Sequence, residues 1–269
     1  MTKEASGHWY LQDGSQLLTV PRKKDGEPIK TTLTHAKKRG DLAPGCTTII
    51  KEANARQLNQ WLIQQGIMSA LTLPRKEDES ETAWLARVEH DRQETGKKAA
   101  SLGSRIHYAI ERYYSGHHED EDYREHVAGV VRLLTRLCPG WTFHPEVGVT
   151  HSTGFGTKSD LHTDSGGHVI DVKTVETKVK GLPTKTYSSH WLQLAATREA
   201  IAESLGRTNL QASILYASRD EPGKCTLVGV TPDQLSVGWE AFNCLTLHWQ
   251  TMNRYAPNWA KRLRITQET

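Results

Sequence analysis

The stretch that most constrains the fold is "GTKSDLHTDSGGHVIDVKT", residues 156–174. Two strand-like runs flank "TDSGG", a sequence typical of a tight turn, so the stretch predicts a β-hairpin. Side chains alternate between the faces of a strand, which places Asp171 and Lys173 on one side and Val172 on the other. Asp160 ends the first run. The hairpin is therefore expected to bring two carboxylates and one ammonium together on one surface.

Such a cluster has a definite chemistry. Two acids at strand ends supply the hard oxygen ligands that Mg²⁺ and Mn²⁺ prefer. A bound ion of this kind polarises a phosphoryl oxygen and lowers the pKa of a water. Lys173 can position that water or stabilise the charge of the transition state. Phosphodiester hydrolysis needs all these groups at once. The alternative is a surface salt bridge between Asp171 and a basic neighbour on an edge strand, since Asp-X-Lys triplets are common by chance.

The pattern of apolar residues changes from helical to alternating at "CPGW". Before it, an N-terminal hairpin with an Asp-Gly turn is expected at 7–20, and helices at 47–67, 82–94, 97–114 and 120–137. After it, strands are expected at 142–151, 154–163, 168–175, 210–218 and 224–231, with helices at 188–205 and 231–256. This order predicts an α/β fold with a helical N-terminal portion. The expected divisions are a hairpin and basic linker (1–45), a helical portion (46–140) and a core (141–269), packed as one unit.

Composition narrows the class of protein. Hydrophobic residues make up 36% of the chain and the mean hydropathy is −0.60. No run approaches the ~18 apolar residues of a membrane span, and the N-terminus lacks a signal-peptide core. We therefore expect no membrane association and a cytoplasmic location. The four cysteines are scattered and are expected to be buried thiols, not a disulfide or metal site (Cys46, Cys138, Cys225 and Cys244).

"SD" at Asp160 followed by "VIDVKT" resembles the signature of the PD-(D/E)XK nuclease superfamily, and more narrowly its RecB-like exonuclease branch. That branch has an upstream helix with a G-x-x-x-H-x-x-x-E-like pattern, which "GSRIHYAIE" matches through His107 and Glu111. It also has a glutamine on the helix after the lysine strand, matched by Gln193. "PGCTTIIK" resembles the "PSVTTIL" segment of phage-encoded and mitochondrial genome-maintenance exonucleases. The resemblance covers residues 44–205 and implies a central mixed sheet flanked by helices, a restriction-endonuclease-like core.

The resemblance also implies roles. Lys173 would act on the water or the scissile phosphate, and Gln193 would orient Lys173 or the DNA. Mg²⁺ or Mn²⁺ would be held by the His107 imidazole, both aspartates and a main-chain carbonyl (His107, Asp160, Asp171 and Val172). Glu146 and Glu111 would either orient the metal ligands or hold a second metal ion. Contacts to DNA are expected from basic and polar side chains near the site (Lys97, Lys98, Arg105, Thr174, Lys178, Lys180, Lys185 and Tyr187).

Two departures from the family pattern matter. Some relatives carry a tyrosine one turn after the helix glutamine, where this chain has Thr197. Others hold an iron–sulfur cluster with one upstream and three C-terminal cysteines, but Cys225 and Cys244 are too few and too far apart, so no cluster is expected. A Walker loop is missing from the sequence, so no ATP use is expected.

The sequence is interpreted as that of a metal-dependent DNA exonuclease acting from free ends, in phage or bacterial recombination, replication or end processing. Its expected partners are DNA, single-stranded or end-bearing duplex, and a single-strand-annealing or recombination protein; its expected location is the cytoplasm of a bacterial host cell. Two alternatives stay open. A restriction-like endonuclease would cut internally, and a non-catalytic nucleic-acid-binding module would keep the fold for scaffolding.

Overall fold

The structure is a computed structural model, and it describes residues 8–53, 56–117, 121–163, 167–208 and 210–261. Within these residues, no helix combines the length and the apolar character that crossing a membrane requires.

A five-stranded mixed sheet forms the centre of the molecule, in the order β5-β6-β7-β8-β9. Neighbouring strands are antiparallel except for β7 and β8, which are parallel and are joined through the crossover helix α6 (Ser188–Leu205). The α/β prediction with a mixed sheet is confirmed. The strand bounds are β5 (Phe143–His151), β6 (Phe155–Thr163), β7 (His168–Val175), β8 (Gln211–Ser218) and β9 (Cys225–Val230).

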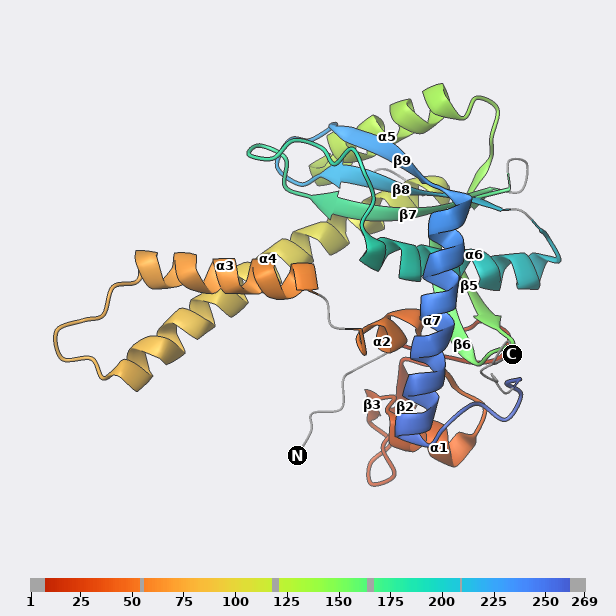
Figure 1. The fold of residues 1–269 in the computed structure, drawn as a ribbon, viewed down its shortest axis with the longest axis horizontal. Coiled ribbons are helices and arrows are strands. Elements are labelled where there is room, and N and C mark those ends of the chain that lie inside the picture. The colour runs from red at the N-terminus through yellow and green to blue at the C-terminus, as the bar shows by residue number, and fades with distance from the viewer. Residues whose placement is uncertain (1–7, 54–55, 118–120, 164–166, 209, 262–269) are drawn as a thin grey trace, which may run out of the picture.

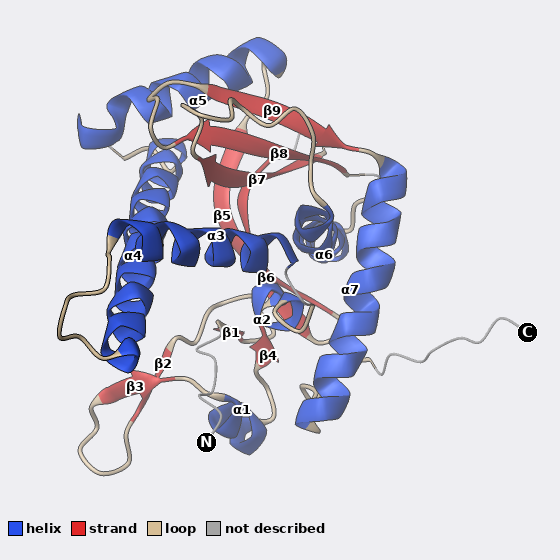
Figure 2. Cartoon of the chain, turned by 60° about the vertical axis from the view of Figure 1, so that its left-hand side comes forward, coloured by secondary structure: helices blue, strands red, loops and turns tan. Residues whose placement is uncertain are grey.

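Helices cover both faces of the sheet (Figures 1 and 2). On one face, α6 and α7 (Pro232–Asn253) share a buried apolar cluster with strand residues such as Val169. On the other face, α4 (Glu81–Tyr114) and α5 (Arg124–Leu137) pack on Ile170 and Val172. Because side chains alternate along β7, Asp171 and Lys173 point toward the α6 side.

The N-terminal segment packs beside β6 rather than standing apart. Gly45 forms a parallel bridge with Gly156, and the ring of Tyr10 lies so close to Gly156 that a Cβ there would be 2.3 Å from it. The expected Asp-Gly turn is present: Gly14 has φ +85° and Leu11 N donates to Ser15 O. The elements are β1 (Trp9–Tyr10), β2 (Thr19–Pro21), β3 (Pro28–Lys30), α1 (Leu33–Arg39), β4 (Ala43–Pro44) and α2 (Cys46–Ile50).

The sequence analysis predicted wrongly where two helical segments are continuous and where they are interrupted. The segment expected as one helix at 47–67 is α2 followed by α3 (Arg56–Thr72). The two helices expected at 82–94 and 97–114 are the single helix α4, which runs through Gly96. The first turn of α4 is capped by Ser80, whose Oγ accepts from Ala83 N. Together α3 and α4 form a hairpin that projects from the sheet (Figure 1), and η1 (Glu121–Tyr123) precedes α5.

Candidate active site

The two aspartates of the hairpin stand where β6 and β7 part. The ladder between these strands ends at the pair Leu161–Ile170, and Asp160 and Asp171 are the next residues on each side. Beyond the ladder the N–H of Val172 has no strand partner in β6, and it donates instead to Asp160 Oδ2 at 2.7 Å. We call the point where β6 and β7 separate, at Asp160 and Asp171, the fork. At the fork, the backbone of β7, the strand that carries Asp171, fixes the position of the Asp160 carboxylate.

Lys173 is held on the same side of β7 as Asp171. Its Nζ donates to Asp171 Oδ1 at 3.0 Å and lies 2.8 Å from Oδ2. It also donates to Gln193 Oε1 of α6 at 2.9 Å. Asp171 is only 6% exposed and the Lys173 side chain is 27% exposed, so the pair is partly shielded from water. The sheet and α6 together therefore fix the position of the ammonium.

His107 reaches the fork from α4, on the opposite face of β7. Its Nε2 lies 3.0 Å from Asp160 Oδ2. Helix and strand come this close because Gly103, one turn earlier, has no side chain: a Cβ there would be 2.6 Å from Thr174 Oγ1. The glycine and the histidine of the upstream motif thus act together, one permitting the approach and the other making the contact.

The pKa values of the charged groups in the site are set by two opposing effects: burial favours the neutral form of each group, and pairing with an opposite charge favours the charged form. Burial alone would raise the pKa of Asp160, but bonds from His107 and the Val172 N–H hold it below its ordinary value. Burial and the Asp160 charge raise the pKa of Asp171. Burial would lower the pKa of Lys173, and the two carboxylates outweigh it and raise that pKa. The fork therefore contains an ionised Asp160 and an ammonium.

The donor set suits a hard divalent cation. Asp171 Oδ2 is buried, and its contact among the described residues is the ion pair with Lys173 Nζ at 2.8 Å. Such a carboxylate oxygen, beside a second carboxylate and a main-chain carbonyl at Val172, is the kind of ligand that Mg²⁺ prefers. His107 bonds to Asp160, and no group of three His, Cys, Asp or Glu side chains in the described residues has metal-binding geometry.

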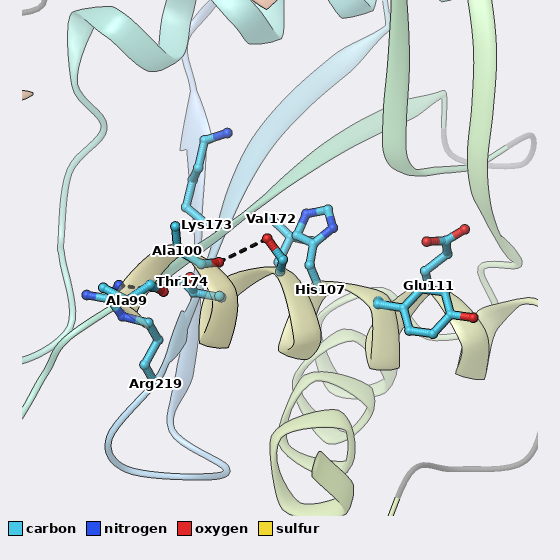
Figure 3. Close-up of a pocket in the computed structure, with 11 residues that line it drawn as sticks. Ala99, Ala100, His107, Glu111, Val172, Lys173, Thr174 and Arg219 are labelled. Carbon is cyan, nitrogen blue, oxygen red and sulfur yellow. Dashed lines mark hydrogen bonds between the residues drawn. The ribbon is translucent and has the colours of Figure 1, made fainter. Parts of the chain in front are cut away.

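A pocket of about 410 Å³ lies beside the fork (Figure 3). One wall is α4 between residues 99 and 111, including His107. The other wall is β7 from Val172 through Lys173 to Thr174. Arg219 closes the end near Ala99, and Glu111 lies at the opposite end, as Figure 3 shows. His107 and Lys173 line the pocket, whereas Asp160 and Asp171 are not among its lining residues.

The two acids expected beside the metal ligands are Glu111 and Glu146. Glu111 is one turn after His107, and its Oε1 is 3.9 Å from Lys158 Nζ. Glu146 is in β5, where the pairs on either side of it place its backbone opposite Asp160. The side chain of Glu146 is outside the described residues.

The predicted DNA-binding residues are only partly gathered at the pocket. Thr174 lines it. Lys97 is paired with Glu94 at 2.8 Å on α4. The other predicted DNA-binding residues do not line the described pocket. Three of them are on α4 (Lys97, Lys98 and Arg105), and four are in the segment between β7 and α6 (Lys178, Lys180, Lys185 and Tyr187).

Sequence reasoning missed several residues around the pocket. Lys158 is two positions before Asp160, and the strand period could have indicated it. Ser104, Tyr108 and Arg219 line the pocket, yet none of them belongs to a motif. Thr197, where some relatives have tyrosine, is buried and within 2.9 Å of the Thr157 hydroxyl, so it faces the core.

No protein-family model and no curated protein matches the sequence. Comparison with solved structures gives matches at low sequence identity and low TM-score. A protein from Eubacterium rectale named for a proposed exonuclease activity shares 15% identity at a TM-score of 0.41, over 57% of this chain and 66% of that one. An alkaline exonuclease from Laribacter hongkongensis shares 15% identity at a TM-score of 0.30, over 56% of this chain and 83% of that one. The chemistry of the site is therefore inferred from its own residues.

Proposed function

We propose that this chain is a metal-dependent deoxyribonuclease that hydrolyses phosphodiester bonds from free DNA ends. One observation carries the proposal: the fork of β6 and β7 brings together Asp160, Asp171 and the ammonium of Lys173 beside a pocket. Two neighbouring carboxylates that are buried or partly buried are costly unless a cation offsets them. Neither a surface salt bridge nor a scaffolding role requires that arrangement, whereas phosphodiester hydrolysis does.

Lys173 is proposed to act electrostatically. Two carboxylates raise the pKa of its ammonium, which therefore keeps its protons near neutral pH. A protonated amine cannot accept a proton from water, but it can orient a water or stabilise negative charge on a phosphoryl oxygen. Gln193 and Asp171 hold the ammonium from two sides, so little reorganisation is needed when charge develops.

Asp160, Asp171 and the Val172 carbonyl would hold a Mg²⁺ or Mn²⁺ ion, with His107 as an imidazole donor beside Asp160. When bound, such an ion polarises the scissile phosphate and lowers the pKa of a water. Mg²⁺ and Mn²⁺ should both support activity, and Mn²⁺ should be at least as effective because imidazole suits transition metals. Ca²⁺, which is larger, should bind without efficient turnover.

The preference for free ends rests on the wall that α4 makes along the pocket. A strand that runs between this helix and β7 enters most easily by its end, while an internal phosphate of a closed circle has to pass over the wall. Basic residues near α4 and after β7 would hold the backbone without reading bases, so sequence preference should be weak.

The cellular role follows from the motif resemblance alone. Its similarity to phage-encoded exonucleases supports recombination, replication or end processing in a bacterial cell, with an annealing or recombination protein as a partner. The divisions at 1–45, 46–140 and 141–269 are proposed to work as one unit, because His107 ties the helical portion to the core.

The test compares end-labelled linear DNA with a covalently closed circle in Mg²⁺, Mn²⁺, Ca²⁺ and excess EDTA. Linear DNA should be degraded to short products with Mg²⁺ and Mn²⁺ only, and the circle should survive. Lys173→Ala should abolish this degradation, while Lys30→Ala, an exposed lysine of β3, should leave it unchanged.

Other results of this test would support one of the alternatives or contradict the proposal. Discrete internal cuts in the closed circle would favour an endonuclease. Tight binding without cleavage of either substrate would favour a scaffold. Undiminished degradation in EDTA would contradict the metal dependence.

A further inference from the structure

Arg219 is a cationic pocket residue that the proposed chemistry does not use. It follows β8 directly and lines the pocket at the end near Ala99. Its Nη1 donates to Ala99 O of α4 at 3.4 Å, a long bond that uses one of the five N–H donors of a guanidinium. The side chain is partly buried. Figure 3 shows it at the opposite end of the pocket from Glu111.

The backbone that carries Arg219 is firmly held. Its N–H donates to Val175 O at 2.8 Å. The next residue, Asp220, accepts from Thr177 N at 2.8 Å, from Lys178 N at 2.9 Å and from the Ser218 hydroxyl at 2.9 Å. These bonds join the turn after β8 to the segment after β7. A side chain on so constrained a turn has a defined origin at the edge of the pocket.

The charge of Arg219 is not matched by a protein carboxylate. No carboxylate among the described residues forms an ion pair with Arg219. Its acidic neighbours are engaged elsewhere: Asp220 by the backbone, and Glu221 by Lys224 and the Thr177 hydroxyl. At the other end of the pocket, Glu111 is near Lys158 instead. The pocket is thus cationic at the Arg219 end and contains an acid at the Glu111 end.

We propose that Arg219 binds a phosphate of the substrate strand, on the Ala99 side of the scissile bond. The inference rests on the proposed nuclease function. Lys173 is tied to Asp171 and Gln193, so the remaining N–H donors of Arg219 are suited to a second phosphate. A guanidinium can address two phosphate oxygens at once.

The geometry sets the reach of this contact. Ala99 and His107 are eight residues apart on α4, about 12 Å along the helix axis. A B-form strand advances about 3.4 Å per nucleotide. Arg219 therefore holds a phosphate within a few nucleotides of the scissile one, and it sets the direction in which the strand lies along the pocket.

Binding tests this contact and cleavage tests the proposed function, so the two can fail separately. A fluorescent oligonucleotide is titrated in Ca²⁺ with wild type, Arg219→Gln and Lys224→Gln, a control cation from the same turn. Single methylphosphonate linkages, which lack the phosphate charge, are then placed at successive positions. Melting temperatures of all three proteins are recorded, and cleavage of the unmodified strand is measured in Mg²⁺.

Arg219→Gln should weaken binding about tenfold or more and reduce the dependence of log Kd on log salt by about 0.7–0.9. Wild type should be weakened by one methylphosphonate position that leaves Arg219→Gln unaffected. Lys224→Gln should match wild type. Equal losses at every position in both proteins, or unchanged binding, would overturn the proposal. A lowered melting temperature with an unchanged methylphosphonate pattern would instead assign Arg219 to holding α4 at Ala99.

Discussion

Lys173 keeps its charge among groups that are largely removed from water, and the reason is local. Burial favours the neutral amine, but the carboxylate of Asp171 at 2.8 Å and that of Asp160 nearby favour the ammonium more strongly. The amide oxygen of Gln193 accepts a hydrogen bond from the Lys173 ammonium. Removing either partner would leave a partly buried charge with fewer contacts, which is unfavourable.

His168 gives a prediction about pH. It is 8% exposed, lies beside Trp141 and exchanges a hydrogen bond with Ser213 at 2.8 Å. Burial lowers its pKa to about 4. A lowered histidine pKa means that the fold favours the neutral ring. The stability this provides is present above the unfolded pKa of ~6.5 and is lost as the pH falls toward about 4.

Acidification from pH 7 to pH 5 should lower the free energy of unfolding by about 2 kcal/mol through His168 alone. Urea unfolding of wild type and His168→Gln at both pH values measures it. The variant should lose less stability on acidification, since other histidines contribute equally to both proteins. Equal losses in the two proteins would contradict the assignment.

The catalytic candidates could be predicted from sequence because strand alternation alone puts Asp171 and Lys173 on one face. The partner of Asp160 could not: its bond to the Val172 N–H depends on where the β6–β7 ladder ends. Arg219 carries no local signal, because it reaches the pocket through a turn held by residues forty positions away.

At the scale of elements, α5 braces the turn that carries Arg219. Gly129 of α5 lies against Gly223, and a Cβ on Gly129 would be 2.4 Å from a backbone oxygen. Gly129→Ala gains about 1 kcal/mol of helix propensity, but forcing the backbone apart costs about 1–3 kcal/mol. The cost of overpacking should exceed the gain in helix propensity, so Gly129→Ala should lower the free energy of unfolding by on the order of 1 kcal/mol.

Gly66 of α3 is the matched control, because its added Cβ meets only Arg92 Cδ at an ordinary 3.5 Å. Gly66→Ala should be neutral or stabilising. Denaturant unfolding of both variants decides the matter: if Gly129→Ala is as stable as Gly66→Ala, the close packing of α5 on the turn is wrong.

The element predictions succeeded where the periodicity was uninterrupted. The helix expected at 188–205 is α6, and the three strands after "CPGW" are β5, β6 and β7. They failed where local sequence and tertiary packing disagree. The two helices expected at 82–94 and 97–114 left a break between them, yet α4 continues through Gly96. A helix glycine costs only about 1 kcal/mol, and the packing of the Ile106 end of the helix offsets it.

At the scale of the whole molecule, three regions far apart in sequence meet at one fork. The sheet supplies the two aspartates and the lysine, α6 supplies Gln193, and α4 supplies His107 (Figure 1). The order of patterns predicted the α/β fold, and the family resemblance implied the mixed sheet. The packing of the N-terminal segment on β6, through Gly45 and Gly156, could not, because bridges between distant glycines leave no periodic signal.

The central claim is that Asp160, Asp171 and Lys173 form a metal-dependent phosphodiesterase site. The most direct measurement is the Mg²⁺-dependent cleavage rate of a labelled linear DNA by wild type and Asp171→Asn. Asp78→Asn, an exposed aspartate of the loop between α3 and α4, is the control. Asp171→Asn should stay folded and lose at least about 10²-fold in rate, while Asp78→Asn should match wild type. Cleavage by Asp171→Asn near the wild-type rate would contradict the account.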